Sequence, residues 1–300
     1  MGSFARTAVG IAAATLSGAT LTAAPSAANA QSTAGARRVV ITVPCDTTQL
    51  VSAVTQANTA GTATIHLARN CTYLTNAPLS FTGASITLRG GPSTAIKADP
   101  AQAAFGPILN VVAGAALRVQ GIFVLGGSGG SGGGIANAGN LTLNFVTITG
   151  NAATNGGGLF NTGRALIVHS VIKASTATAN GGGIFNQTGG TLTVFETLVA
   201  GNNAGNQGGG TFTNAGASTR IIQSTIEKNT AAQGGGIANF GATSLDRTLV
   251  QQNKANPGLA NGGGIFNAGA VGSVTLRRSL VRTNAPTNCS PVGTIPGCLG

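Results

Sequence analysis

The sequence predicts an all-β chain that winds into a right-handed parallel β-helix, a solenoid, with one short helix capping its N-terminal end. Three observations lead to this fold: a glycine block that recurs at a nearly constant spacing, a β-branched alternating run after each block, and an asparagine-bearing turn after each run. The 300 residues include 48 glycines, and 42% of all residues are apolar. That much apolar sequence can form a sizeable core, and so many glycines indicate many tight turns.

The glycine block has six copies, and each is too short to bury a core alone. Successive copies start 24, 25, 27, 26 and 28 residues apart. They begin at Gly132 (GGGIAN), Gly156 (GGGLFN), Gly181 (GGGIFN), Gly208 (GGGTFT), Gly234 (GGGIAN) and Gly262 (GGGIFN). A period this short leaves no room for a crossover helix, so it predicts stacked coils of two or three strands each. The leucine pattern of a leucine-rich horseshoe is missing, and three aspartates are too few for a calcium-binding roll.

Alternating β-branched runs follow the blocks and are typical of strands. Each run ends in a polar turn that carries asparagine at an equivalent position, with Ser175 as the exception. Asparagine tolerates left-handed backbone and can bond its neighbours in a turn. Stacked at a rise of about 4.8 Å per coil, such side chains are expected to form hydrogen-bonded ladders. The ladder residues are Asn151, Asn202, Asn229, Asn253 and Asn284 in the turns, and Asn137, Asn161, Asn186, Asn239 and Asn267 in the blocks.

The first thirty residues have the features of an export signal. Arg6 is followed by a mildly apolar run over residues 9–21, and residues 28–30 read Ala-Asn-Ala, which fits a small-residue cleavage site. We therefore expect a signal peptide over 1–30, a mature chain from about Gln31, and no later stretch that spans a bilayer as a helix. A disordered Ala/Thr tail or a short membrane anchor is the competing interpretation.

A short helix is expected just before the first coils, capped by Asp46 or Thr47. Its apolar face consists of Leu50, Val51, Val54 and Ala57. Such a helix covers the open end of a solenoid, where strand edges otherwise invite aggregation. We divide the remaining chain into a flexible segment (31–44), a disulfide-tied N-terminal cap (45–79), first coils (80–131), six repeat coils (132–285) and a disulfide-closed C-terminal cap (286–300).

Four cysteines, an even count in a chain expected to be exported, indicate disulfide bonds. Three pairings are possible. We favour Cys45 with Cys71 and Cys289 with Cys298, because an elongated repeat protein holds its two ends far apart. The first bond would tie the cap to a first strand at residues 64–67. Bound metal is the alternative, but the chain has no C-x-x-C spacing and two histidines, so we expect no metal and no cofactor.

The motifs also resemble a known family. The blocks GGGIAN, GGGLFN and GGGIFN, followed by turns such as ITGN at 148–151, resemble the polymorphic outer-membrane-protein repeat with its GGAI and FxxN signatures. That family belongs among pectate-lyase-like right-handed β-helices. The segment CDTTQLVSAVTQAN at 45–58 is similar to the N-terminal cap of secreted bacterial β-helix proteins. The likeness covers about residues 45 to 285, and it implies secretion or display at the cell surface or wall.

The chain is strongly basic, since 16 Lys and Arg against 5 Asp and Glu give a net charge of +11. Such a charge draws a protein to anionic partners. In the aligned coils Arg247 and Arg278 share one column, and Arg277 and Arg282 flank it. We expect these four arginines to bind an extracellular polysaccharide or an anionic cell-wall polymer. No nucleic acid is expected, because no reading motif is present. A positive face that only keeps the protein soluble is the alternative.

The fifth residue of each glycine block, which follows Ile, Leu or Thr, forms a column that is mostly aromatic. It is Ala136 or Ala238 in two copies and phenylalanine in the other four, among them Phe160, Phe185 and Phe212. A close-packed interior tolerates such volume changes poorly. We therefore predict that the column faces outward and that these three phenylalanines form an accessible ring ladder for binding. An internal aromatic stack is the alternative, because exposing large rings has its own cost.

The positions of the carboxylates bear on whether the chain is an enzyme. β-Helix relatives include polysaccharide lyases and glycoside hydrolases, which use such groups. Hydrolysis needs two carboxyls about 5 to 10 Å apart. The acids are Asp46, Asp99, Glu196, Glu227 and Asp246, and the aligned coils stack no two of them directly. His169 beside Glu196 is a candidate acid/base couple, although a surface hydrogen bond or weak ion pair is the more ordinary interpretation. We assign no catalytic residue and favour a secreted or surface-associated, monomeric, non-catalytic scaffold that binds extracellular or cell-wall polymers; the alternative is a carbohydrate-active lyase or hydrolase.

Overall fold

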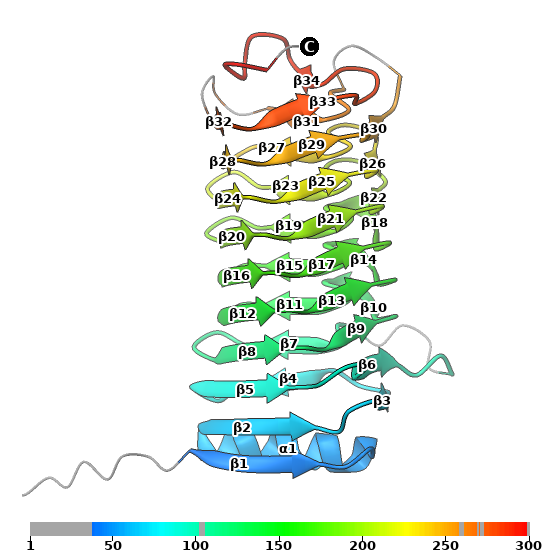
Figure 1. Cartoon of the computed structure of the whole chain (residues 1–300), viewed down its shortest axis with the longest axis vertical. Coiled ribbons are helices and arrows are strands. Elements are labelled where there is room, and N and C mark those ends of the chain that lie inside the picture. Colours follow the sequence, from blue (N-terminus) through cyan, green and yellow to red (C-terminus); the bar gives the residue numbers. More distant parts are fainter. Residues whose placement is uncertain (1–37, 102–105, 258–260, 269, 271–272, 299–300) are drawn as a thin grey trace, which may run out of the picture. The chain divides into compact units, whose positions relative to one another are not determined.

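The computed structural model describes residues 38–101, 106–257, 261–268, 270 and 273–298, all within one compact unit, residues 36–300. The predicted signal peptide lies outside the described residues. The described chain forms a parallel β-solenoid in which each coil lies on the one before it (Figure 1). The predicted fold class is therefore confirmed. Right-handed winding, the general rule for parallel strands joined by a crossover, stays a prediction.

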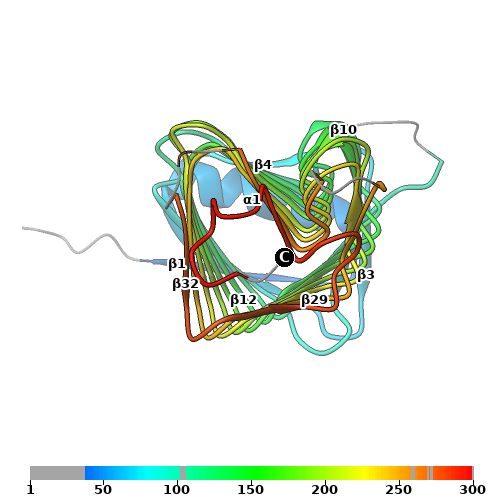
Figure 2. The ribbon, with the colours of Figure 1, turned by 90° about the horizontal axis from the view of Figure 1, so that it is seen from above.

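Four parallel sheets form the walls of the described solenoid, as the view along its axis shows (Figure 2). Sheet A contains β1 (Val39–Val43), β2 (Thr62–Leu67), β5 (Ser85–Arg89), β8 (Ala116–Gln120), β12 (Asn140–Asn144), β16 (Arg164–Val168), β20 (Thr191–Phe195), β24 (Ser218–Ile222), β28 (Ala242–Asp246) and β32 (Val274–Arg277). Sheet B contains β3 (Thr72–Thr75), β6 (Ala95–Ala98), β9 (Phe123–Leu125), β13 (Thr147–Thr149), β17 (Val171–Lys173), β21 (Leu198–Ala200), β25 (Thr225–Glu227), β29 (Leu249–Gln251) and β33 (Leu280–Arg282).

The other two sheets complete each coil. Sheet C contains β4 (Leu79–Phe81), β7 (Leu109–Val111), β11 (Ile135–Asn137), β15 (Leu159–Asn161), β19 (Ile184–Asn186), β23 (Thr211–Thr213), β27 (Ile237–Asn239), β31 (Ile265–Asn267) and β34 (Cys289–Ser290). Sheet D contains β10 (Ser128–Ser131), β14 (Ala152–Asn155), β18 (Thr176–Asn180), β22 (Asn203–Ala204), β26 (Thr230–Ala231) and β30 (Lys254–Ala255).

Strands of successive coils pair in parallel and in register. In sheet A, for example, Asn140 of β12 lies opposite Arg164 of β16, which lies opposite Thr191 of β20. Side chains alternate across each strand, so one set points into the solenoid and the other points out. Leu117 and Val119 of β8 are buried in the core, whereas Arg118 between them is exposed. Equivalent residues therefore form columns that run along the outer surface, and these columns position the candidate sites.

Glycine is required in the blocks because the backbone turns sharply and neighbouring coils approach closely. The first glycine of each described block has a positive φ, for example 65° at Gly156. A side chain is also sterically excluded two residues later, because a Cβ atom at Gly158 would lie 2.6 Å from the carbonyl oxygen of Gly183. The blocks thus make the turn from sheet D into sheet C.

Asparagine side chains in the turns after sheet B form a buried ladder. The amide of Asn202 donates to Asn229, Asn229 donates to Asn253, and Asn253 donates to Asn284, each at 3.0 Å. The left-handed residue predicted at these positions lies one place earlier, as at Lys228 with φ 54°. The asparagine itself is buried because its amide satisfies backbone groups inside the coil, such as the carbonyl of Val199.

A second ladder follows sheet C. Asn137 donates to Asn161 at 2.7 Å, Asn161 donates to Asn186 at 2.8 Å, and Asn239 donates to Asn267 at 2.9 Å. Thr213 interrupts the asparagine series. At this coil three threonine hydroxyls connect the asparagines on either side. The hydrogen bonds run from Asn186 through Thr219, Thr213 and Thr243 to Asn239.

The N-terminal cap contains helix α1 (Thr47–Ala60), which lies against the first coils at the bottom of Figure 1. Asp46 caps the helix by accepting a hydrogen bond from the backbone N–H of Gln49 at 3.0 Å. Its buried face consists of Leu50, Ala53, Val54 and Ala57. The prediction of Val51 on this face is wrong: Val51 is 47% exposed, because the strict helical spacing from Leu50 selects Ala53.

The predicted flexible segment 31–44 is wrong in its last part, because Val39–Val43 form β1 and pair with β2. Pairing to an otherwise open edge of sheet A orders this segment. Both predicted disulfides are confirmed. Cys45 is bonded to Cys71 and Cys289 to Cys298, with Cα–Cα distances of 5.6 and 6.2 Å.

Candidate functional site

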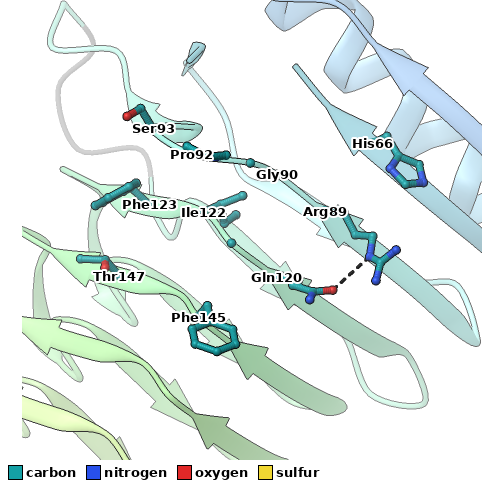
Figure 3. Close-up of a pocket in the computed structure, with 12 residues that line it drawn as sticks. His66, Arg89, Gly90, Pro92, Ser93, Gln120, Ile122, Phe123, Phe145 and Thr147 are labelled. Carbon is teal, nitrogen blue, oxygen red and sulfur yellow. Dashed lines mark hydrogen bonds between the residues drawn. The ribbon is translucent and has the colours of Figure 1, made fainter. Parts of the chain in front are cut away.

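A shallow pocket of about 480 Å³ opens at the corner between sheets A and B in the first coils (Figure 3). His66, Arg89 and Gln120 lie opposite one another on β2, β5 and β8. Phe145, directly after β12, and Phe123, at the start of β9, also line the pocket. Arg89 points outward because Leu88 next to it fills the core. The pocket therefore collects charged and aromatic side chains that the alternation of several coils directs to the surface.

An arginine-lined hollow of about 360 Å³ adjoins this pocket on the outer face of sheet A. The two share Arg89 and Gln120, and the Nε of Arg89 donates to Oε1 of Gln120 at 3.0 Å, the dashed line in Figure 3. Arg118 and Arg38 also line the hollow, and Arg38 donates from Nη2 to Oγ1 of Thr87 at 2.7 Å. None of the five acidic residues lines the pocket or the hollow. We call the two together the basic groove.

The column that contains Arg247 and Arg278 is a row of left-handed turn residues between sheets A and B. Each has a positive φ, which residues other than glycine rarely adopt. The residues are Phe145 (53°), His169 (47°), Glu196 (44°), Gln223 (49°), Arg247 (51°) and Arg278 (49°). Hydrogen bonds to the next coil hold this conformation, since the backbone N–H of His169 donates to the carbonyl of Phe195 at 3.2 Å. The turn projects every one of these side chains outward.

His169 and Glu196 are brought together on this column. The Nε2 of His169 lies 2.6 Å from Oε2 of Glu196, and both side chains are 39% exposed. The ring of Phe145 stacks on His169 with centroids 4.9 Å apart. Water screens a pair this exposed, so the contact contributes little to stability. The geometry nevertheless holds the imidazole and the carboxylate in one place at the surface.

Two carboxylates line one hollow, although they do not stack directly. Glu196 and Glu227 both border a depression of about 510 Å³ over sheet B. Glu227 accepts a hydrogen bond from Nε2 of Gln251 at 2.9 Å, and its other oxygen lies 4.0 Å from the Nζ of Lys228. The aligned coils place these two acids in different columns. The hollow joins them because it crosses from the corner turn onto the strands of sheet B.

The predicted C-terminal basic face is assembled only in part. Arg247 and Arg278 occupy successive places in the corner column, and Arg277 precedes Arg278 at the end of β32. Asp246 lies opposite Arg277, and its carboxylate is 3.5 Å from Nη2 of Arg247. Arg282 lies apart, at the end of β33 in sheet B. All four arginines are exposed, but an acid lies among them.

The predicted accessible ring ladder is wrong for two of its three residues. Phe185 and Phe212 are only 5% and 6% exposed, and Phe160 is half-buried. The rings stack face to face along sheet C at 5.2 and 4.8 Å, which covers both faces of the middle rings. Phe240 supplies the ring that Ala238 lacks. This cluster is separate from the main core, and it lies on a different sheet from the arginines.

Sequence reasoning missed the basic groove. Arg38 lies in the segment predicted to be flexible, and the first coils lack the glycine block that aligned the later ones. An alignment of SITLR at 85–89 with ALRVQ at 116–120 would have placed Arg89 beside Gln120 and Thr87 beside Arg118. The alternating pattern predicts strands in these coils, but it does not indicate which residues of successive strands lie opposite one another.

Comparisons with protein-family models, with curated proteins and with solved structures found no match. Within the described ranges, no group of three or more His, Cys, Asp or Glu side chains is placed to hold a metal ion. No helix in the described part of the chain is long and apolar enough to cross a membrane. The fold and the groove thus define a parallel β-solenoid with an exposed cationic surface.

Proposed function

We propose that the chain is a secreted or surface-associated scaffold that binds anionic extracellular or cell-wall polymers and does not cleave them. The observation that carries this proposal is the unpaired positive charge of the outer surface. The chain has 16 Lys and Arg. Among the described residues, only Arg247 and Lys228 of these lie within 4.0 Å of a carboxylate oxygen. A surface of this kind attracts polyanions over a range of about 10 Å at moderate salt.

Two features support export. Disulfide bonds close both ends of the described solenoid, and such bonds persist in oxidising compartments. The first thirty residues also carry the signal-peptide pattern. We further propose that the repeats are of the polymorphic outer-membrane-protein type within the pectate-lyase-like class. This assignment rests on the glycine blocks and the asparagine turns.

A glycan panel tests the proposal. The full chain is presented with neutral and anionic polysaccharides of similar length, and release of shortened products is measured in the same samples. Binding to the anionic members without product release is expected. Equal binding to neutral members, or no binding to any anionic member, would contradict the proposal.

Glycoside hydrolysis is a second candidate, favoured by the hollow that Glu196 and Glu227 share. In that case one carboxyl protonates the leaving oxygen and the other activates water or attacks directly. Product release in the panel that disappears in both Glu196→Gln and Glu227→Gln, but persists in Asp99→Asn, would establish this activity. Asp99 is a suitable control because it lies outside that hollow.

A further inference from the structure

We propose that the basic groove is a subsite for an acidic sugar unit, with the arginines binding its oxyanion and the exposed rings packing against its C–H face. The inference rests on the proposed function and names the place and the ligand class. The subsite lies in the first coils, apart from the C-terminal arginines. Two hollows that share lining residues form one continuous surface there.

The cationic half of the subsite is held in place yet not neutralised. Gln120 accepts from Nε of Arg89, and Thr87 accepts from Nη2 of Arg38, so both guanidinium groups are oriented by neutral partners. Within the described residues, neither group nor that of Arg118 lies within 4.0 Å of a carboxylate. Oriented guanidinium groups bind carboxylate or sulfate oxygens through charge-assisted, often paired hydrogen bonds. Three such groups lie around one hollow, so the oxyanion of a ligand bound there would supply the anionic partner that they lack among the described residues.

The aromatic half lies beside it. Phe145 is 60% exposed and Phe123 is 39% exposed, and both line the pocket that contains Arg89. One face of Phe145 stacks on His169, and the pocket side of both phenylalanines stays open to a ligand. An aromatic wall with a few polar groups is the usual composition of a small-ligand site. A sugar ring offers both an apolar C–H face and polar groups at its rim. The positions of the phenylalanines and arginines fit one such unit.

A single-stranded nucleic acid would also use cations and aromatic rings. The observations favour sugar, because Phe123 and Phe145 line one pocket with Arg89. Beyond Phe145 the ring of His169 stacks in parallel, but Phe195 meets His169 edge-on, which breaks the row along which successive bases would stack. Preferential binding of a single-stranded nucleic acid would therefore overturn the inference.

Four probes separate the ligand chemistries by calorimetry. They are a hexuronate hexasaccharide, the same oligosaccharide with its carboxyls reduced to hydroxymethyl groups, a sulfated neutral hexasaccharide, and a single-stranded oligothymidylate. The inference predicts binding of the hexuronate and loss of binding on carboxyl reduction. Binding of the sulfated probe would identify a general oxyanion site. Preferential binding of the oligothymidylate would overturn the inference.

Variants locate the site, with Arg89→Gln/Arg118→Gln compared against Arg164→Gln/Arg220→Gln. The control pair removes the same charge from the same outer face of sheet A, outside the basic groove. The groove pair is expected to weaken hexuronate binding by about tenfold or more, and the control pair by about twofold at most. Phe145→Ala is expected to weaken binding more than Leu166→Ala, since Leu166 is 40% exposed on the same sheet but outside the groove.

The outcomes distinguish this inference from the proposed function. If the wild-type chain binds the hexuronate and both arginine pairs weaken binding equally, the basic groove is not a subsite, although polyanion binding stands. If the wild-type chain binds none of the anionic probes, the proposed function fails as well. Thermal unfolding of each variant in the absence of ligand shows that a loss of binding is not a loss of folding.

Discussion

Tyr73 joins the N-terminal cap to the first coils through a buried hydroxyl. Its side chain is fully buried, and the hydroxyl accepts from the backbone N–H of Ala68 at 2.9 Å and lies 3.0 Å from the carbonyl oxygen of Pro44. Burial raises the pKa of Tyr73 above its ordinary value of 10.0, because the phenolate cannot be hydrated there; the hydrogen bond from Ala68 lowers it by less. The stability that this residue contributes is thus sensitive to pH.

The sign of that pH dependence follows from the raised pKa. Tyr73 is neutral in both states below pH 10, so its contribution is fully present there and is lost as pH rises through the higher folded pKa. Tyr73 is the single tyrosine and the chain has no tryptophan, so phenolate absorbance reports this residue alone. We expect its transition above that of free tyrosine amide. A transition at or below that value would contradict the buried hydroxyl.

Tyr73→Phe should remove the pH effect and also destabilise the fold. The variant removes the hydrogen bonds of the hydroxyl, but the Ala68 N–H still donates to the carbonyl of Val43 at 3.1 Å and the Pro44 carbonyl still accepts from the N–H of Asp46 at 2.7 Å. Because both backbone groups keep a partner, the free energy of unfolding is expected to fall by about 0.5 to 1.5 kcal/mol. Denaturant unfolding at neutral and high pH measures both changes. Equal stability of the two proteins at neutral pH would show that these hydrogen bonds contribute nothing.

Glycine blocks set how closely two coils stack. A Cβ at Gly183 would lie 2.6 Å from the carbonyl oxygen of Gly210 and 3.0 Å from Nδ2 of Asn202, whereas a Cβ at Gly130 on β10 meets nothing within 4 Å. Gly183→Ala is expected to lower the free energy of unfolding by about 1 to 3 kcal/mol. Gly130→Ala, the matched control, should change it by less than about 0.5 kcal/mol. Similar losses in both would contradict the steric explanation.

The turn ladder has one gap that substitution should fill. Ser175 takes the place of an asparagine between Asn151 and Asn202, and its hydroxyl bonds only the carbonyl of Lys173 among described partners. Beside the other ladder asparagines a block glycine lies against the amide, and Gly158 is the block glycine at the equivalent place for Ser175, with the methyl groups of Ile172 and Ile148 as its nearest side-chain neighbours. Ser175→Asn is expected to raise the free energy of unfolding by about 0.5 to 1.5 kcal/mol. A loss of stability greater than that of Ser175→Ala would show that the coil cannot hold the amide.

Elements that depend on a short sequence pattern repeated along the chain could be predicted from the sequence. The glycine blocks and alternating runs predicted the parallel coils because backbone turns and side-chain alternation depend on residue type at a fixed spacing. Burial of Phe185 and Phe212 could not be predicted in the same way, because stacked neighbours cover these rings although the column lies outside the main core. Likewise β1 depends on pairing with β2, which no local pattern around Val39–Val43 reveals.

At the scale of the whole molecule, the candidate sites lie on columns that join different coils. The basic groove and the hollow containing Glu196 and Glu227 each combine residues of neighbouring coils. To predict such a site, one must know which residues of neighbouring strands lie opposite one another. The glycine blocks provide this register for the later coils only. The sequence therefore does not place the arginines of the first coils, whereas it does place Arg247 and Arg278 in one column.

The C-terminal arginines remain a candidate contact surface for polyanions. Arg247→Gln/Arg278→Gln/Arg282→Gln should weaken binding by up to about 1 kcal/mol per charge if this face is used, and less where Asp246 already pairs with Arg247. Affinity of the triple variant for a carboxylated polymer measures the contribution. An unchanged affinity would exclude this face and leave the first coils as the contact surface.

The salt dependence of polymer binding tests the central claim most directly. Affinity of the full chain for a carboxylated polysaccharide is measured over a series of salt concentrations, with the length of the polymer followed in the same samples. Because the contact is between unpaired cations and a polyanion, we predict that affinity falls steadily as salt rises while the polymer keeps its length. Affinity that does not change with salt, or a polymer that is shortened, would contradict a non-catalytic polyanion-binding scaffold.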